Sequence, residues 1–213
     1  MYRSRMRCLL LISCLFCMCS CFAPYKQLQK TKGDVSCVQQ FKPVFTTALY
    51  NTQVNVIGKH LSGLLIIKTM PDSSVRIVFS NEAGFKFFDF GFKGNDFKVY
   101  YVYKEMDKKP VIKTLRKDFQ LVLMNKLDNT NASILKKDAV SYYTFPDGKD
   151  HYYYITDGPC TRMIRMERGS ARKPVMTAIA QHFNEGMPDT IGITHTNFNF
   201  EIGLKRIYHY AER

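Results

Sequence analysis

Residues 62–90, SGLLIIKTMPDSSVRIVFSNEAGFKFFDF, consist of three apolar stretches separated by two turn sequences. The middle stretch, VRIVFS at 75–80, places apolar side chains at every second position, which is typical of a strand with one buried face. The separators, PDSS at 71–74 and NEAG at 81–84, are rich in residues that favour turns. This part of the chain therefore predicts three consecutive antiparallel strands.

The third of these strands, FKFFDFGF at 85–92, carries aromatic residues on both faces. A strand with only one buried face does not need them, so either protein covers both faces or one face borders an apolar cavity. Asp89 is an acid in this apolar setting. We expect it to form an ion pair with Lys86 or Arg76, and the alternative is that it binds a polar headgroup.

The β pattern continues on both sides of this group and is interrupted once. Pro110 suits the first turn of a helix, and apolar residues then recur at helical spacing up to residue 124. The apolar stripe of this helix consists of Ile112, Leu115, Phe119 and Val122. Roughly nine to eleven strands surround the helix. They are expected at 44–57, 61–70, 75–80, 85–92 and 97–103, and then at 139–145, 152–156, 161–168, 175–183, 190–196 and 197–208.

An antiparallel sheet with this many strands usually curls. With one helix available for its concave side, the sequence predicts a mostly β fold. The fold is a single curved antiparallel sheet, an open or half-closed β-barrel, with the central helix as a plug or lid. About 190 mature residues are enough for one domain with one core.

The N-terminus has the features of an export signal. Arg3, Arg5 and Arg7 precede an apolar run at 9–18, which is too short to span a hydrocarbon core of roughly 30 Å. The segment resembles a bacterial lipoprotein signal peptide, in which the cysteine after the cleavage site is acylated. We therefore expect a signal peptide at 1–20, a lipidated tether and linker at 21–42, and the folded domain at 43–210.

Cys21 is the expected lipidation site, because cleavage before it leaves a signal of ordinary length. LISC, ending at Cys14, matches the lipoprotein sequence better by letter but leaves a short apolar core, and Cys19 follows a large residue. A signal that is removed without lipidation, or an uncleaved anchor, is the remaining alternative. In every case the folded part is exported.

Two cysteines besides Cys21 remain in the mature chain. Export to an oxidising compartment allows a disulfide between Cys37 and Cys160, and two unpaired thiols are the alternative. Neither cysteine has the spacing of a metal ligand, and we expect no metal site.

The net charge of the chain is +13, and loss of the three N-terminal arginines leaves 28 basic against 18 acidic side chains. Nucleic acid is the usual partner of so basic a chain, but export removes it. The basic residues are spread along the sequence, which favours an ordinary solvated surface. Attraction to anionic lipid headgroups is the functional alternative.

Catalysis has little support in the sequence. Motifs for a nucleophile elbow, a zinc protease or a phosphate-binding loop are absent. The five histidines are interpreted as surface or capping residues rather than ligands. They are His60, His151, His182, His195 and His209. We expect neither an enzyme nor a cofactor.

Sixteen phenylalanines and thirteen tyrosines are many for one domain, and aromatic rings can line a wide apolar groove. For each residue taken alone, an ordinary place in the core is the better interpretation. The candidate groove residues are Leu64, Ile66, Ile77, Phe79, Phe88, Phe90, Phe198, Phe200 and Ile202.

The chain has a signal, a run of strands, a helix and further strands that end in NFNFEIGLKRI at 197–207. This order resembles the LolA/LolB superfamily of periplasmic lipoprotein carriers and outer-membrane receptors, particularly its Bacteroidetes type. The resemblance covers about 44–207. It implies an unclosed barrel with a helical lid and an apolar interior that accepts lipoprotein acyl chains. One departure concerns the loop at 80–84, which lacks the exposed leucine of the receptor branch.

The resemblance implies a monomer that is anchored in the outer membrane by its lipid. The residues after Cys21 lack an acidic cluster, which favours the periplasmic face. Acyl chains of lipoproteins or lipids would be the ligand, and a periplasmic carrier protein would be a further partner. The alternative function is an accessory envelope lipoprotein with a filled core that binds a protein partner.

Overall fold

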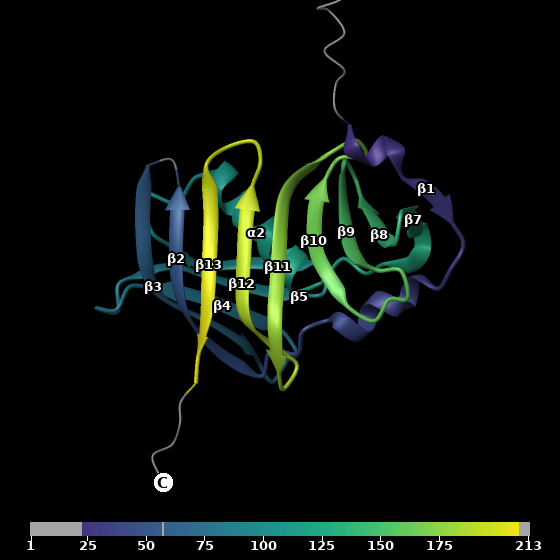
Figure 1. The fold of residues 1–213 in the computed structure, drawn as a ribbon. Helices are drawn as coiled ribbons and strands as arrows, with labels where there is room; N and C mark the ends of the chain where they lie inside the picture. The colour runs from purple at the N-terminus through teal and green to yellow at the C-terminus, as the bar shows by residue number, and fades with distance from the viewer. Residues whose placement is uncertain (1–22, 57, 209–213) are drawn as a thin grey trace, which may run out of the picture.

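A computed structural model describes residues 23–56 and 58–208 of the chain. Thirteen strands form one antiparallel sheet in the order β1-β7-β8-β9-β10-β11-β12-β13-β2-β3-β4-β5-β6. Its two edges are β1 and β6, which do not pair with each other, so the barrel is open (Figure 1). The predicted fold class is confirmed: a mostly β fold with one curved antiparallel sheet and a central helix.

The elements follow the sequence pattern closely. Short 3₁₀ helices are η1 (Pro24–Gln27), η2 (Val35–Phe41) and η3 (Asn129–Asn131), and the α-helix is α2 (Lys109–Val122). The strands before α2 are β1 (Gln29–Thr31), β2 (Thr47–Val56), β3 (Lys59–Thr69), β4 (Val75–Ser80), β5 (Lys86–Lys93) and β6 (Asp96–Val102). The strands after it are β7 (Ser133–Lys137), β8 (Val140–Asp147), β9 (Asp150–Asp157), β10 (Met163–Gly169), β11 (Pro174–Asn184), β12 (Met187–His195) and β13 (Phe200–Ile207).

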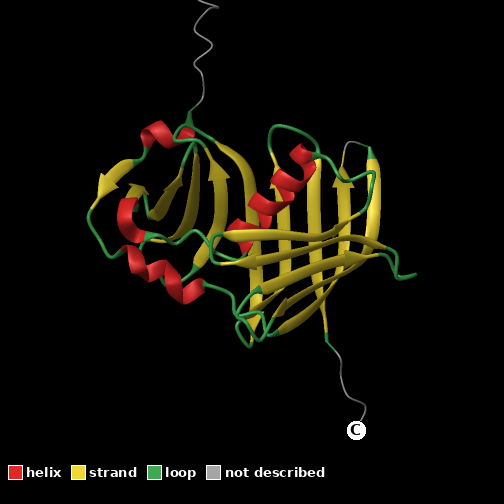
Figure 2. Cartoon of the chain, turned by 180° about the vertical axis from the view of Figure 1, so that it is seen from behind, coloured by secondary structure: helices red, strands yellow, loops and turns green. Residues whose placement is uncertain are grey.

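The sheet bends around α2. In Figure 1, β2, β13, β12 and β11 stand in front, and α2 lies behind them together with β4 and β5. Seen from the other side, the helix crosses the concave surface at an angle to the upright strands (Figure 2). It contacts β10 and β11 on one side, and its Phe119 ring lies 5.9 Å from that of Phe88 in β5 on the other. The helix is therefore enclosed by two parts of the same sheet.

Strand register decides which side chains meet α2. Leu65 of β3 pairs with Phe79 of β4, which pairs with Phe88 of β5, and all three are buried. Ile67 and Ile77 form a second buried row beside them. Since alternate residues of a strand point to opposite faces, the residues between them point outward.

Both faces of β5 are covered by protein, which is one of the two interpretations of its aromatic sequence. Phe88, Phe90 and Phe92 face the core. On the outer face, the ring of Tyr100 lies over Gly91, where a Cβ atom would come within 2.7 Å of the ring. A larger residue at position 91 would push the ring of Tyr100 away from this face of the strand.

The structure differs from the sequence prediction in two short strands, β1 and β7, which pair with each other. The segment 21–42 was expected to be a tether and linker. From Ala23 onward it instead belongs to the folded body, because Tyr25 and Val38 are buried and β1 joins the sheet. The signal peptide and Cys21 lie outside the described residues. Within the described residues, no helix has the length and apolar character needed to cross a membrane.

Candidate functional site

Most of the predicted groove residues meet in one core. Ile77, Phe79, Phe88 and Phe90 face α2 from β4 and β5, and Phe200 and Ile202 belong to the same buried cluster. Three residues of the set lie elsewhere. Leu64 and Ile66 alternate with the buried Leu65 and Ile67 and so point to the outer face of β3, where Ile66 is 39% exposed. Phe198 is 36% exposed in the loop before β13.

The space that a groove would need is occupied by α2 itself. Leu115, Phe119 and Val122 are buried, and Ile112, nearer the start of the helix, is half-buried. Phe88 stacks on Phe90 with ring centres 4.5 Å apart and also contacts Phe119. In this arrangement the rings contact one another and the helix, so a guest would have to displace helix side chains.

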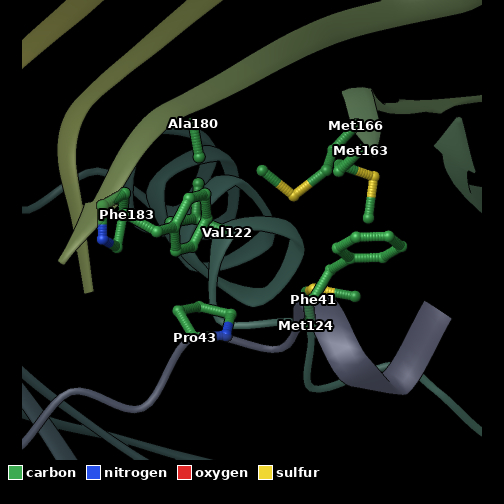
Figure 3. Close-up of a pocket in the computed structure, with 9 residues that line it drawn as sticks. Phe41, Pro43, Val122, Met124, Met163, Met166, Ala180 and Phe183 are labelled. Carbon is green, nitrogen blue, oxygen red and sulfur yellow. The ribbon is translucent and has the colours of Figure 1, made fainter. Parts of the chain in front are cut away.

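A small apolar pocket lies where α2 ends (Figure 3). It has a volume of about 10 Å³, roughly that of one water molecule. Three of its lining residues are methionines, whose unbranched side chains adapt to new packing. We call this pocket the methionine seam. It is lined by Phe41, Pro43, Val122, Met124, Met163, Met166, Ala180, Phe183 and Pro188.

A buried ionic network fixes the middle of α2 to the sheet. Asp118 of α2 is fully buried, and its Oδ2 lies 2.8 Å from Nε2 of His195 at the end of β12. Its Oδ1 accepts a hydrogen bond from Arg168 of β10 at 3.3 Å. Arg168 also lies 3.7 Å from Asp150, which forms a second ion pair with Lys117. One helix is thus tied to three strands.

This network was not predicted from the sequence, in which His195 was interpreted as a surface or capping residue. His195 is instead buried. One signal was present: Asp118 lies three residues after Leu115 and four before Val122, within the apolar stripe of the helix. A carboxylate in such a stripe needs a charged or hydrogen-bonding partner. Which strand supplies the partner cannot be read from spacing, because Asp118 and His195 are 77 residues apart.

The start of the described chain is clamped onto the outer face of the sheet. Tyr25 is buried there, with its ring 4.3 Å from that of Tyr153. Its hydroxyl donates a hydrogen bond to Glu167, which also accepts one from Arg165 at 2.7 Å. Burial first, and then the charge of Glu167, raise the pKa of Tyr25 far above its ordinary value. Burial also raises the pKa of Tyr153, to about 12.

Cys37 and Cys160 form a disulfide with their Cα atoms 6.6 Å apart. The bond joins η2 to the turn between β9 and β10. The side chain of Gln40 donates hydrogen bonds of 3.0 Å to the carbonyl oxygens of both cysteines. The second half of the expected linker is therefore covalently attached to the sheet.

Asp89 lies on the outer face of β5 and is held by cations. Arg76 contacts it through two nitrogens, at 2.6 and 2.9 Å, and Lys86 lies 3.4 Å away. The guanidinium of Arg76 also lies 3.7 Å from the ring centre of Tyr100. This is the expected ion pair, with both expected partners. Elsewhere in the described ranges, no group of three or more histidine, cysteine or acidic residues could hold a metal ion.

Comparison with solved structures gives likenesses at low sequence identity. No family model and no curated protein matches the chain. Among solved structures, a DUF1329 family protein from Desulfovibrio piger shares 9% identity with a TM-score of 0.43, covering 84% of this chain and 92% of the other. A protein from Vibrio parahaemolyticus, provisionally described as an outer membrane lipoprotein-sorting protein domain, shares 8% identity with a TM-score of 0.44, covering 84% and 93%. Likenesses at this level carry no functional argument.

Proposed function

We propose that this chain is an exported, lipid-anchored envelope protein that acts through its outer surfaces, with its interior filled by its own helix. The observation that carries the proposal is the position of α2, whose Leu115, Phe119 and Val122 are buried where an acyl chain would lie. Exposing three such side chains costs roughly 5 to 9 kcal/mol, a large share of the stability of an ordinary domain. The contacts of Asp118 with His195 and Arg168 would also be lost if the helix moved.

The exposed edge of strand β6 is a surface to which a protein partner could bind. Among the described residues no strand pairs with its outer side, and its Val99, Tyr100 and Tyr101 are exposed, as is the nearby Phe85. Exposed edges with large apolar side chains are sites where another chain can add a strand. This arrangement suits an accessory protein that binds an extended segment of an envelope protein.

Native mass spectrometry of the mature protein, purified from cells in mild detergent, tests the filled interior. We expect one species carrying the anchor lipid and no additional bound lipid. A second population heavier by one or more lipids, which persists after detergent exchange, would overturn the proposal and favour a carrier.

The test of the β6 edge is a photo-crosslinking amino acid placed in cells at Tyr101, with a matched position at Gln53 on the exposed face of β2. We expect a crosslink to one defined envelope protein from position 101 and none to that protein from position 53. Equal crosslinking from both positions would contradict an edge-specific partner.

The methionine seam favours a second candidate function, binding of an acyl chain at the end of α2. Its flexible side chains could separate without removing the whole helix. In this case Ala180→Trp, which fills the seam, should abolish binding of a fluorescent fatty acid. Ile179→Trp, on the exposed opposite face of the same strand, is the control. Absence of saturable binding by the unsubstituted protein would exclude this candidate.

A further inference from the structure

The clamp at Tyr25 determines where the chain enters the domain. The Tyr25 backbone N–H donates a hydrogen bond of 3.2 Å to the carbonyl of Arg172, in the turn between β10 and β11. The Tyr25 side chain is buried and bonded to Glu167. Figure 1 shows the N-terminal end of the described chain at this turn, at the top of the sheet. Anything attached to the N-terminus is therefore held close to one particular rim.

Strand register shows which turns share this rim. Gly169 pairs with His151, which places the turn between β8 and β9 beside the turn between β10 and β11. Met176 pairs with His195, and Phe200 pairs with Val56, which adds the loop after β12 and the turn after β2. We call this set the N-terminal rim. It consists of residues 58–60, 147–150, 170–173 and 196–199.

The free charges of the N-terminal rim are positive. Four exposed basic side chains lie there, and none has an ion-pair partner within the described ranges. They are Lys59, Lys149, Arg172 and Lys173. Both acids of the rim are already paired, Asp147 with Lys126 at 3.1 Å and Asp150 with Lys117 and Arg168.

The opposite rim has a mixed charge. Asp138 and Glu185 lie in its turns, together with Arg162 and the nearby Lys137. Glu185 pairs with Arg206 at 3.7 Å, and its side chain is 77% exposed. The two rims of the same sheet are therefore electrostatically different.

An exposed aromatic residue lies on the N-terminal rim among these cations. Phe198 is in the loop between β12 and β13, with its ring stacked on Phe200 at 5.7 Å between centres and against His195 at 4.8 Å. The stacking supports an outward-facing ring at the tip of the loop. Aromatic side chains beside basic residues suit the boundary between lipid headgroups and acyl chains.

We propose that the N-terminal rim lies against the membrane and binds anionic lipid headgroups. The inference rests on the proposed lipid anchor at Cys21. Cys21 is four residues before Tyr25 and can lie at most about 14 Å from it along an extended chain. So short a connection to a clamped residue holds the rim near the bilayer, and the four free cations match a negative headgroup surface. The opposite rim, with the turn at 185–186, faces away.

The first test measures orientation on the mature protein as it is processed in cells, reconstituted in vesicles of phosphatidylcholine and phosphatidylglycerol. Ala171→Cys on the N-terminal rim and Ala139→Cys on the opposite rim are matched exposed alanines, and each is labelled with a fluorophore. A headgroup-attached quencher should reduce the emission at position 171 at least fivefold more than that at position 139. Equal or reversed quenching in protein that floats with the vesicles would overturn the proposed orientation.

Flotation itself separates the two proposals. Protein that does not float with the vesicles would overturn the lipid anchor, and with it the orientation. Protein that floats but shows no difference in quenching would leave the anchor standing and overturn only the orientation.

The second test concerns the charge of the rim. The rim variant carries three substitutions in the Ala171→Cys protein, namely Lys149→Glu, Arg172→Glu and Lys173→Glu. The control carries three others in the same protein, namely Lys30→Glu, Lys136→Glu and Lys137→Glu. Each free cation near an anionic surface contributes a factor of about five to binding. We expect the quenching at position 171 to fall in the rim variant, while staying above that at position 139 because the short connection to Cys21 is unchanged, and to persist in the control. Unchanged quenching in the rim variant would overturn headgroup binding by these residues.

Discussion

Nε2 of His195 lies 2.8 Å from Oδ2 of Asp118, and both side chains are almost completely buried. His195 is at the end of β12, and Asp118 is in the middle of α2. Arg168 reaches the other oxygen of the same carboxylate. The contact places a charged group inside an otherwise apolar interface between helix and sheet, and it ties the helix to a single position.

Asp118→Asn should destabilise the protein by about 3 kcal/mol, because Arg168 would remain buried with only the more distant Asp150 to balance its charge. Urea unfolding followed by circular dichroism measures this. The control is Asp107→Asn, an exposed acid just before the same helix, which should change stability by less than about 0.5 kcal/mol. Similar effects of the two substitutions would show that the network does not fix α2.

Phe119→Ala should lower the free energy of unfolding by about 3 to 5 kcal/mol, because the Phe119 ring is fully buried against Phe88 and its removal leaves a cavity. The exposed Val99→Ala on β6 should cost less than about 1 kcal/mol. The same denaturation experiment measures both variants. A small loss for Phe119→Ala would mean that α2 is loosely packed, and it would reopen the question of a groove beneath the helix.

Removing the disulfide, as Cys37→Ser with Cys160→Ser, should lower stability by about 2 to 5 kcal/mol. The bond closes a loop with a sequence separation of 123 residues, and long loops restrict the unfolded chain most. Unfolding midpoints of the unsubstituted protein with and without reductant should show the same loss. If reduction leaves the midpoint unchanged, the bond contributes nothing to stability.

Tyr25→Phe should make stability less sensitive to alkaline pH. The pKa of Tyr25 is raised by burial and by Glu167, so its neutral form stabilises the folded state fully below the ordinary tyrosine pKa of about 10. This contribution is lost progressively as the pH rises above that value. We expect the free energy of unfolding of the unsubstituted protein to exceed that of the variant by about 1 kcal/mol at pH 7 and by less at pH 11.

The other buried tyrosines are the same in both proteins, so the difference in urea unfolding isolates Tyr25. Glu167→Gln provides a second comparison, because it removes the charge and keeps a hydrogen-bond acceptor for the hydroxyl. A difference between the unsubstituted protein and Tyr25→Phe that stays constant from pH 7 to pH 11 would contradict the assigned pKa.

Much of the fold could be predicted from local patterns. The alternation at 75–80 corresponds to β4, and the helical spacing from Pro110 onward corresponds to α2. β7 was missed because its five residues, SILKK, contain too little alternation to stand out. β1 was missed because all three of its residues are exposed and polar. Such strands form because a neighbouring edge is available, which is a property of the assembled sheet.

The sequence by itself determined the strands and the helix, and which face of most of them is apolar, because side-chain periodicity is a local property of the chain. The tertiary structure alone decided what covers those faces. It placed α2 inside the curve of the sheet, joined Asp118 to His195, and clamped Tyr25 beside Arg172. These contacts depend on sheet curvature and on pairing between residues far apart in the chain, and local periodicity contains neither.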